Sequence, residues 1–155
     1  MFHRWPALVL ALVFWATLPK QAAGQQSQTA PKPSAGKIGA SWPNPFNPIV
    51  HTPFTIGEGC KSGETHVVTV RILNILAQPV VIPVLFGPSA NSTSSASSSM
   101  NGSRISNLRL DCGDYVAFWD GNVEGGGREA ASGTYIVQVI VDNVLAASAR
   151  IYYRK

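Results

Sequence analysis

Alternation of apolar and polar side chains is the strongest pattern in this chain, and it predicts β-strands. In residues 66–75, Val68, Val70 and Ile72 alternate with polar side chains, which places one face of the segment in a core and the other in water. Outside the first twenty residues, no window shows the 3.6-residue apolar period of an amphipathic helix. The same period of two predicts strands at 51–56, 80–86, 114–119, 135–141 and 145–153, with Leu108 and Leu110 as an extension of the strand at 114–119.

Turn-forming residues separate these strands. Asp120-Gly121 and Ser132-Gly133 flank a Gly-rich loop, and Asp142-Asn143 follows the next strand; Gly takes positive φ at no steric cost. Pro83 marks an edge or a bulge, because proline cannot donate a ladder hydrogen bond. About seven short antiparallel strands with turns roughly every 8–12 residues predict an all-β fold, a β-sandwich.

The N-terminus has the pattern of a secretory signal peptide over residues 1–24. A short positive segment ending at Arg4 precedes the apolar run Trp5–Leu18, and Ala22-Ala23-Gly24 supplies small residues for cleavage. The alternative is a membrane anchor, but the apolar run is shorter than the roughly 20 residues that span a bilayer. We therefore expect an exported protein without a membrane span after cleavage.

Composition divides the remaining chain. Residues 25–40 are rich in Gln, Ser, Ala, Pro and Lys, which predicts a disordered linker. A domain is expected over 41–155, opening with a rigid lead-in, Trp42–Pro48, in which prolines fix φ. The Ser-rich run at 87–107 cannot bury enough apolar area to order itself, and we interpret it as a disordered insertion in the domain.

Charge gives no support for a nucleic-acid partner. The formal net charge is +4, but removal of residues 1–24 takes away Arg4 and Lys20 and leaves +2. The remaining basic residues are scattered singly rather than clustered, so binding to nucleic acid is not expected.

Two cysteines, Cys60 and Cys112, are present. An even pair in an exported protein predicts a disulfide. The predicted strand directions place both cysteines at one pole of the sandwich, and place the lead-in and the turn at 74–78 at the opposite pole.

Catalytic and metal-binding patterns are weak. His51 and His66 remain after signal cleavage, and no Cys/His cluster has the spacing of zinc ligands along the chain. Serines gather only in the segment 87–107, where nothing would hold a catalytic triad together. We therefore expect no enzyme and no cofactor.

One segment carries a faint calcium pattern. Asp120, Asn122 and Glu124 match early positions of a calcium loop, but Ala131 stands where a bidentate Glu is expected. Asp120 is equally explained as a turn residue, so we expect no metal there. The aromatic residues Trp42, Phe46, Trp119 and Tyr135 leave two alternatives open, a sugar-binding platform or a core cluster at one pole.

Four short motifs occur one after another along the chain. They are Pro43-Asn44-Pro45-Phe46-Asn47-Pro48 with Thr52 and Phe54-Thr55-Ile56 after it, Val70-Arg71-Ile72-Leu73-Asn74-Ile75-Leu76-Ala77-Gln78-Pro79-Val80, Trp119-Asp120-Gly121, and Ser132-Gly133-Thr134-Tyr135.

Together these motifs resemble the FlgD-like, immunoglobulin-like domain of flagellar hook-capping proteins. The same module overlaps with the C-terminal sorting domains of the type IX secretion system. The resemblance spans residues 42–155, apart from the insertion, and implies an immunoglobulin-like β-sandwich.

The functional prediction has three forms. The first is an exported, non-catalytic module for protein–protein interaction or assembly in the cell envelope, located in the periplasm, at the outer membrane or outside the cell. The second, implied by the resemblance, is a type IX sorting domain recognised through its lead-in and last strand. The third is a ligand- or glycan-binding module that uses the pole around Trp119.

Overall fold

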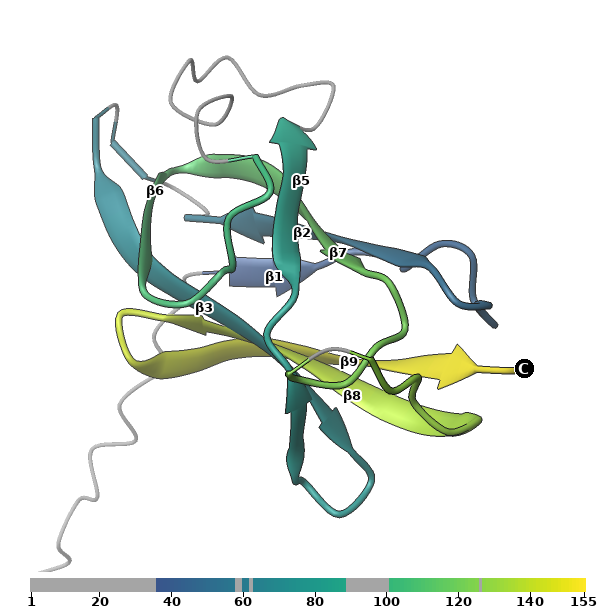
Figure 1. Cartoon of the computed structure of the whole chain (residues 1–155). Helices are drawn as coiled ribbons and strands as arrows, with labels where there is room; N and C mark the ends of the chain where they lie inside the picture. Colours follow the sequence, from purple (N-terminus) through teal and green to yellow (C-terminus); the bar gives the residue numbers. More distant parts are fainter. Residues whose placement is uncertain (1–35, 58–59, 62, 89–100, 126) are drawn as a thin grey trace, which may run out of the picture. The chain divides into compact units, whose positions relative to one another are not determined.

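The computed structural model describes residues 36–57, 60–61, 63–88, 101–125 and 127–155, and these residues form two antiparallel β-sheets without a helix (Figure 1). They all belong to one compact unit. The signal peptide expected at 1–24 lies outside the described residues. Within the described ranges, no helix is long and apolar enough to cross a membrane.

The first sheet has four strands in the order β1-β2-β7-β5. The long antiparallel pair at its centre, β2 with β7, runs from Val50 opposite Trp119 to Ile56 opposite Gly113. The strands are β1 (Gly36–Ile38), β2 (Val50–Ile56), β7 (Gly113–Trp119) and β5 (Val84–Pro88).

The second sheet is built around β3 and β8. Its main order is β4-β3-β8-β9, and β6 pairs with the first half of β3. Val68 pairs with Leu108 of β6 and with Val141 of β8, so β6 and β8 flank opposite edges of β3. The strands are β3 (Thr65–Asn74), β4 (Pro79–Val81), β6 (Leu108–Asp111), β8 (Gly133–Val141) and β9 (Val144–Tyr153).

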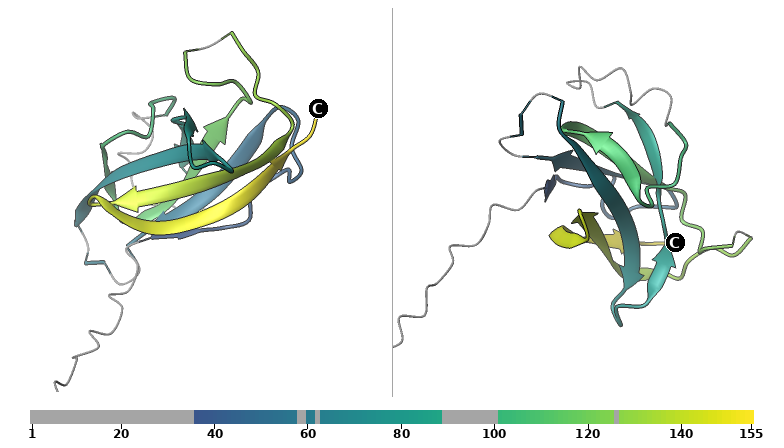
Figure 2. Two further views of the ribbon diagram at one scale, coloured as in Figure 1. Left: turned by 90° about the horizontal axis from the view of Figure 1, so that it is seen from below. Right: turned by 90° about the vertical axis from the view of Figure 1, so that its left-hand side faces the viewer.

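The core lies between the two sheets, which form two layers (Figure 2). Strand β2 buries every second side chain, and β8 does the same from Tyr135 to Val141. This is the period that a half-buried strand requires. The prediction of an all-β fold is confirmed, with two antiparallel sheets around a common core.

The number of strands was underestimated, since the described residues alone form nine. The segment predicted as one strand at 80–86 is divided: β4 lies in the second sheet and β5 in the first. Pro83 lies at the break, where it has no N–H to offer either sheet. Likewise, Leu108 and Leu110 do not extend β7 but form β6 in the other sheet, and the chain changes sheets at Cys112.

Two expected boundaries also differ. The first strand, β1, begins at Gly36, inside the linker expected at 25–40, because its backbone pairs with β2 although its side chains carry no strand pattern. Residues 101–107, expected to belong to the disordered insertion, form backbone hydrogen bonds with β5 and β3 instead, and Ile105 is fully buried. Gly87 and Pro88, the first two residues of the expected insertion, belong to β5. Residues 25–35 and 89–100 lie outside the described residues.

Candidate functional site

The lead-in Trp42–Pro48 connects the two sheets. Trp42 and His51 of β2 exchange two backbone hydrogen bonds of 2.9 Å in the first sheet. Phe46 pairs in parallel with Tyr153 of β9 in the second sheet. The peptide bonds before Pro43, Pro45 and Pro48 are cis. The contacts of Trp42 and Phe46 therefore join the lead-in to β2 of the first sheet and to β9 of the second.

Aromatic side chains form a cluster beneath the lead-in, which we call the pole cluster: Phe46, Trp119, Tyr135 and Tyr153. The Phe46 ring lies 4.8 Å from the Tyr153 ring and 5.3 Å from the Trp119 ring, and Trp119 lies 5.2 Å from Tyr135. Trp119 is 2% exposed and donates its indole N–H to the Asn122 carbonyl oxygen. The cluster is therefore part of the core.

Trp42 does not join the pole cluster. Its side chain is 48% exposed and stacks on the His51 ring at 5.5 Å. The four aromatics that could have formed a sugar-binding platform are thus divided, three in the core and one on the surface.

The remaining motif residues hold turns and strand ends. Asn74 Oδ1 accepts hydrogen bonds from the N–H groups of Leu76 (2.9 Å) and Gln78 (3.0 Å), which fixes the β3–β4 turn. Ser132 Oγ accepts one from the Lys155 N–H at 3.0 Å, and Gly133 pairs with Tyr153. These residues position β4 and β9 rather than offer reactive groups.

A polar network borders the pole cluster. The Tyr153 hydroxyl donates to Glu129, and Lys155 Nζ lies 3.1 Å from the same carboxylate. Burial of the phenol, together with its hydrogen bond to Glu129, raises the pKa of Tyr153 to about 12. The hydrogen bond from Tyr153 and the Lys155 ammonium lower the pKa of Glu129. Burial also raises the pKa of Tyr135, whose hydroxyl donates to the Ala131 carbonyl oxygen at 2.6 Å.

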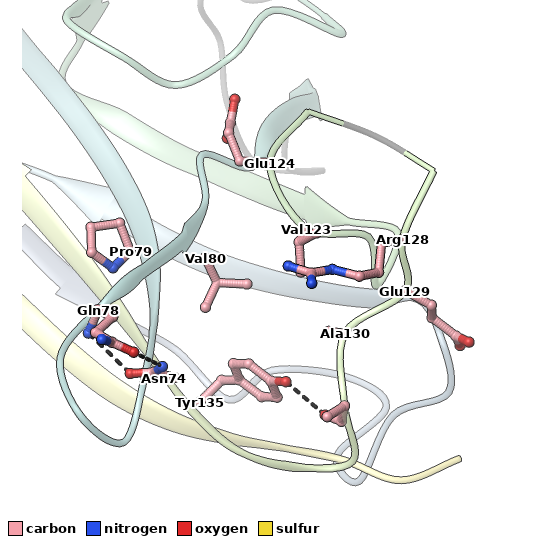
Figure 3. Close-up of a pocket in the computed structure, with 11 residues that line it drawn as sticks. Asn74, Gln78, Pro79, Val80, Val123, Glu124, Arg128, Glu129, Ala130 and Tyr135 are labelled. Atoms are coloured by element: carbon pink, nitrogen blue, oxygen red, sulfur yellow. Dashed lines mark hydrogen bonds between the residues drawn. The ribbon is translucent and has the colours of Figure 1, made fainter.

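A hollow of about 510 Å³ lies between β4 and the loop that follows β7 (Figure 3). Val80 and Val123 give it apolar walls, and Arg128 and Glu129 lie on the loop side in Figure 3. Tyr135 lines it from β8. Charged side chains of both signs, Glu124, Arg128 and Glu129, line the hollow.

The faint calcium pattern lies on the same loop, and its side chains have protein partners. Asp120 accepts hydrogen bonds from the backbone N–H and the side-chain amide of Asn122, at 3.0 and 2.9 Å, which is an Asx-type turn. Glu124 pairs with Arg104 and accepts the Ile82 N–H at 3.1 Å. Both carboxylates therefore stabilise the loop.

The outer edge of β9 is partly covered by the lead-in. Tyr152 donates its N–H to Asn44 Oδ1 (3.0 Å) and accepts the Phe46 N–H (2.9 Å). Backbone groups of a strand face the same edge at every second residue, so Ser148 and Arg150 direct theirs to this edge too. Among the described strands, none pairs with β9 on that side. A short edge for strand addition thus remains between the lead-in and the β8–β9 turn.

The predicted disulfide is formed: Cys60 and Cys112 are bonded, with Cα atoms 6.2 Å apart. The ring of His66 lies beside it, with Nε2 3.5 Å from Cys60 Sγ. The other ring nitrogen, Nδ1, lies 2.7 Å from Asp142 Oδ2. Glu64 completes this group, which we call the disulfide corner: Cys60, Glu64, His66, Cys112 and Asp142.

Sequence reasoning missed the disulfide corner as a cluster. Cys60 and Cys112 are separated by 52 positions, and Asp142 is farther still, so no local spacing unites them. The register of β3 with β6 and β8 brings them together, since Thr65 pairs with Asp111 and Val68 with Val141. Tyr153 was missed for a similar reason, because its partner Glu129 lies on a loop.

No family model matches the chain, and no curated protein matches it. Among solved structures, the chain is similar to the Pseudomonas fluorescens alkylpurine DNA glycosylase AlkC bound to DNA containing an abasic site analog, at 16% identity and a TM-score of 0.45. The match covers 79% of this chain but 31% of the glycosylase.

That similar structure is an enzyme, and this finding contradicts the expectation that the chain is not one, which we withdraw. A TM-score below 0.5 carries neither an activity nor a ligand across to this chain. The absence of a nucleic-acid partner stays a prediction.

Proposed function

We propose that this chain is an exported, immunoglobulin-like β-sandwich that binds a protein of the cell envelope by strand addition at the edge of β9. The observation that carries the proposal is this edge: Ser148 and Arg150 are exposed and direct their backbone groups away from β8. Added strands gain affinity from main-chain hydrogen bonds.

Two further observations support export and the family. The disulfide suits an oxidising compartment, and the N-terminal pattern suits a signal peptide. The motifs that resemble those of hook-capping proteins lie at turns and in the lead-in that bonds to both sheets, and this arrangement supports the proposed family. The location is therefore the periplasm, the outer membrane or the cell exterior.

The test is a Ser148→Pro variant beside a Ser148→Ala control. Proline removes the outward N–H without breaking the ladder to β8, as proline does on edge strands, whereas alanine keeps it. The mature protein is immobilised and exposed to an envelope extract, and the captured proteins are identified. We expect a protein that binds the wild type and the Ser148→Ala variant, and is lost with Ser148→Pro at an unchanged melting temperature. Equal capture by all three would reject strand addition at this edge.

A sorting role in type IX secretion is the second candidate. It is favoured by one observation: the lead-in and the last strand, the two parts that the resemblance implicates, bond directly through Phe46 and Tyr153. Residues 25–155 fused behind a periplasmic reporter should carry it to the surface of a cell that has the type IX machinery. Retention in the periplasm would contradict this role.

A further inference from the structure

We propose that the disulfide corner is a redox-gated zinc site. When the Cys60–Cys112 bond is reduced, the two thiolates and Nε2 of His66 bind Zn²⁺, and the Glu64 carboxylate takes the fourth position. Thiolate, imidazole and carboxylate groups are the ligands that zinc prefers in a tetrahedral site. This proposal does not depend on strand addition at β9.

The ligand atoms are already gathered. One atom from each of Cys60, Glu64, His66 and Cys112 lies within 4.8 Å of the others. With zinc bonds of about 2.0–2.3 Å, tetrahedral ligands are roughly 3.3–3.8 Å apart, and Cys60 Sγ is 3.5 Å from His66 Nε2. Reduction frees the two bonded sulfurs to separate to this spacing, and the Glu64 carboxylate, within 4.8 Å of the other ligand atoms, closes on the metal.

His66 is oriented as a ligand by Asp142. The carboxylate accepts the Nδ1–H at 2.7 Å, which leaves the Nε2 lone pair directed at the sulfur side. Asp142 is itself held by the Val67 N–H at 3.0 Å. A carboxylate behind the ring is the usual outer partner of a zinc-bound histidine, because it fixes the tautomer and raises the basicity of the ligand.

Gly57 makes room for the sulfurs. A Cβ on Gly57 would lie 1.7 Å from Cys60 Sγ and 2.9 Å from Cys112 Sγ, and the residue has a φ of +75°. The backbone therefore passes directly against the proposed centre, at a position where only glycine fits without displacing a ligand atom.

A dithiol reductant supplies two electrons and two protons to the Cys60–Cys112 bond and becomes a disulfide. The two cysteine thiols then release both protons to solvent as they bind Zn²⁺, since the thiolate is the ligand. In the oxidised protein neither sulfur is a thiolate, so the site exists only after reduction.

The test compares the oxidised mature protein with the same protein reduced by a phosphine. Each form is titrated with Co²⁺ and then with Zn²⁺, while absorption and melting temperature are recorded. We expect the reduced form to bind one equivalent of Co²⁺ with a thiolate charge-transfer band and the strong visible bands of tetrahedral cobalt. Zinc should displace the cobalt and raise the melting temperature of the reduced form, and the oxidised form should show neither effect.

Variants separate this site from adventitious binding by thiols. His66→Gln should lose the tetrahedral spectrum, and Asp142→Asn should weaken binding by about 10–100-fold. Asparagine suits the positive φ of 50° at position 142, so that variant keeps the turn. His51→Gln is the control, because His51 lies at the opposite end of β2 and should leave metal binding unchanged.

Two results would overturn the proposal. One is a reduced wild type that takes up no stoichiometric Co²⁺. The other is a His66→Gln variant that binds the metal with wild-type affinity and spectrum, which would show that the thiols act without the histidine. If reduction unfolds the chain, far-ultraviolet circular dichroism is recorded before and after zinc is added. The proposal requires that zinc restores the β-sheet signal, and a signal that stays unfolded rejects the site.

Discussion

At the scale of single residues, Gly121 shows how the pole is held together. It has a φ of +82°, and a Cβ there would lie 2.7 Å from the carbonyl oxygen of Pro48 and 2.8 Å from its Cβ. The Gly121 carbonyl oxygen also accepts the Ala130 N–H at 2.8 Å, which closes the loop after β7. The Trp-Asp-Gly motif is therefore a contact between the loop and the lead-in, and its glycine is required by close approach.

Replacement of Gly121 by alanine should destabilise the domain more than the same change at Gly125. Both glycines have positive φ, but nothing lies within 4 Å of a Cβ at Gly125. We expect Gly125→Ala to cost about 1 kcal/mol for the backbone conformation and Gly121→Ala to cost about 1–3 kcal/mol more for the clash. Urea unfolding of both variants measures the difference, and equal losses would contradict the contact with Pro48.

The raised pKa of the Tyr153 phenol predicts that the domain loses stability at high pH. Its pKa is raised to about 12 in the folded protein, against about 10 in an unfolded chain. The neutral phenol is the form that folding favours, so this contribution is complete below pH 10 and is lost as the pH rises toward 12. Urea unfolding across this window should show a shallower decline for Tyr153→Phe than for wild type. The raised pKa of Tyr135 acts in the same direction, so some decline should remain.

The lowered pKa of Glu129 predicts a separate loss of stability at low pH. Its pKa is lowered in the folded state, so its contribution is present above its ordinary pKa of 4.5 and is lost as the pH falls below it. The stability advantage of wild type over Glu129→Gln should therefore shrink between about pH 5 and pH 2. An advantage that stays constant over this range would mean that the contacts with Tyr153 and Lys155 do not lower the pKa of Glu129.

At the scale of elements, Ile105 joins β3 to the segment between β4 and β5. Its N–H donates to the Pro83 carbonyl oxygen at 3.0 Å, and its carbonyl oxygen accepts the Val70 N–H at 2.9 Å. Its side chain is 0% exposed. The chain thus returns from the Ser-rich run to β3 before it forms β6, and this anchor fixes where β6 begins.

Truncation of this anchor should be costly, in contrast to the same change on the surface. Ile105→Ala should lower the free energy of unfolding by about 2–5 kcal/mol, the range for a buried isoleucine. Ile75→Ala, at a side chain that is 69% exposed, should change it by no more than about 0.5 kcal/mol. Chemical unfolding decides, and a loss below 1 kcal/mol for Ile105→Ala would place that segment outside the core.

At the scale of the whole domain, the period-two segments and the cysteine pair were readable in the sequence because local rules govern them. The pairing of β1 was not, because Gly36–Ile38 is held by backbone bonds that leave no side-chain pattern. The division of 80–86 and the fate of Leu108 were missed because a change of sheet depends on neighbours far along the chain. In the disulfide corner, the bond between the cysteines could be predicted from the sequence. The proximity of His66 and Asp142 could not, because it follows from the register of the strands.

The disulfide is expected to stabilise the domain as a whole, because it joins the loop after β2 to the point where the chain changes sheets. It closes a loop of about 50 residues, for which the chain-entropy model gives roughly 4 kcal/mol. Reduction in the presence of a chelator, which keeps metal away from the thiols, should therefore lower the melting temperature by about 15 °C. A Cys60→Ala/Cys112→Ala double variant should melt near the reduced wild type and should not respond to the reductant. A wild type whose melting temperature is the same with and without reductant would show that the bond adds nothing to the folded state.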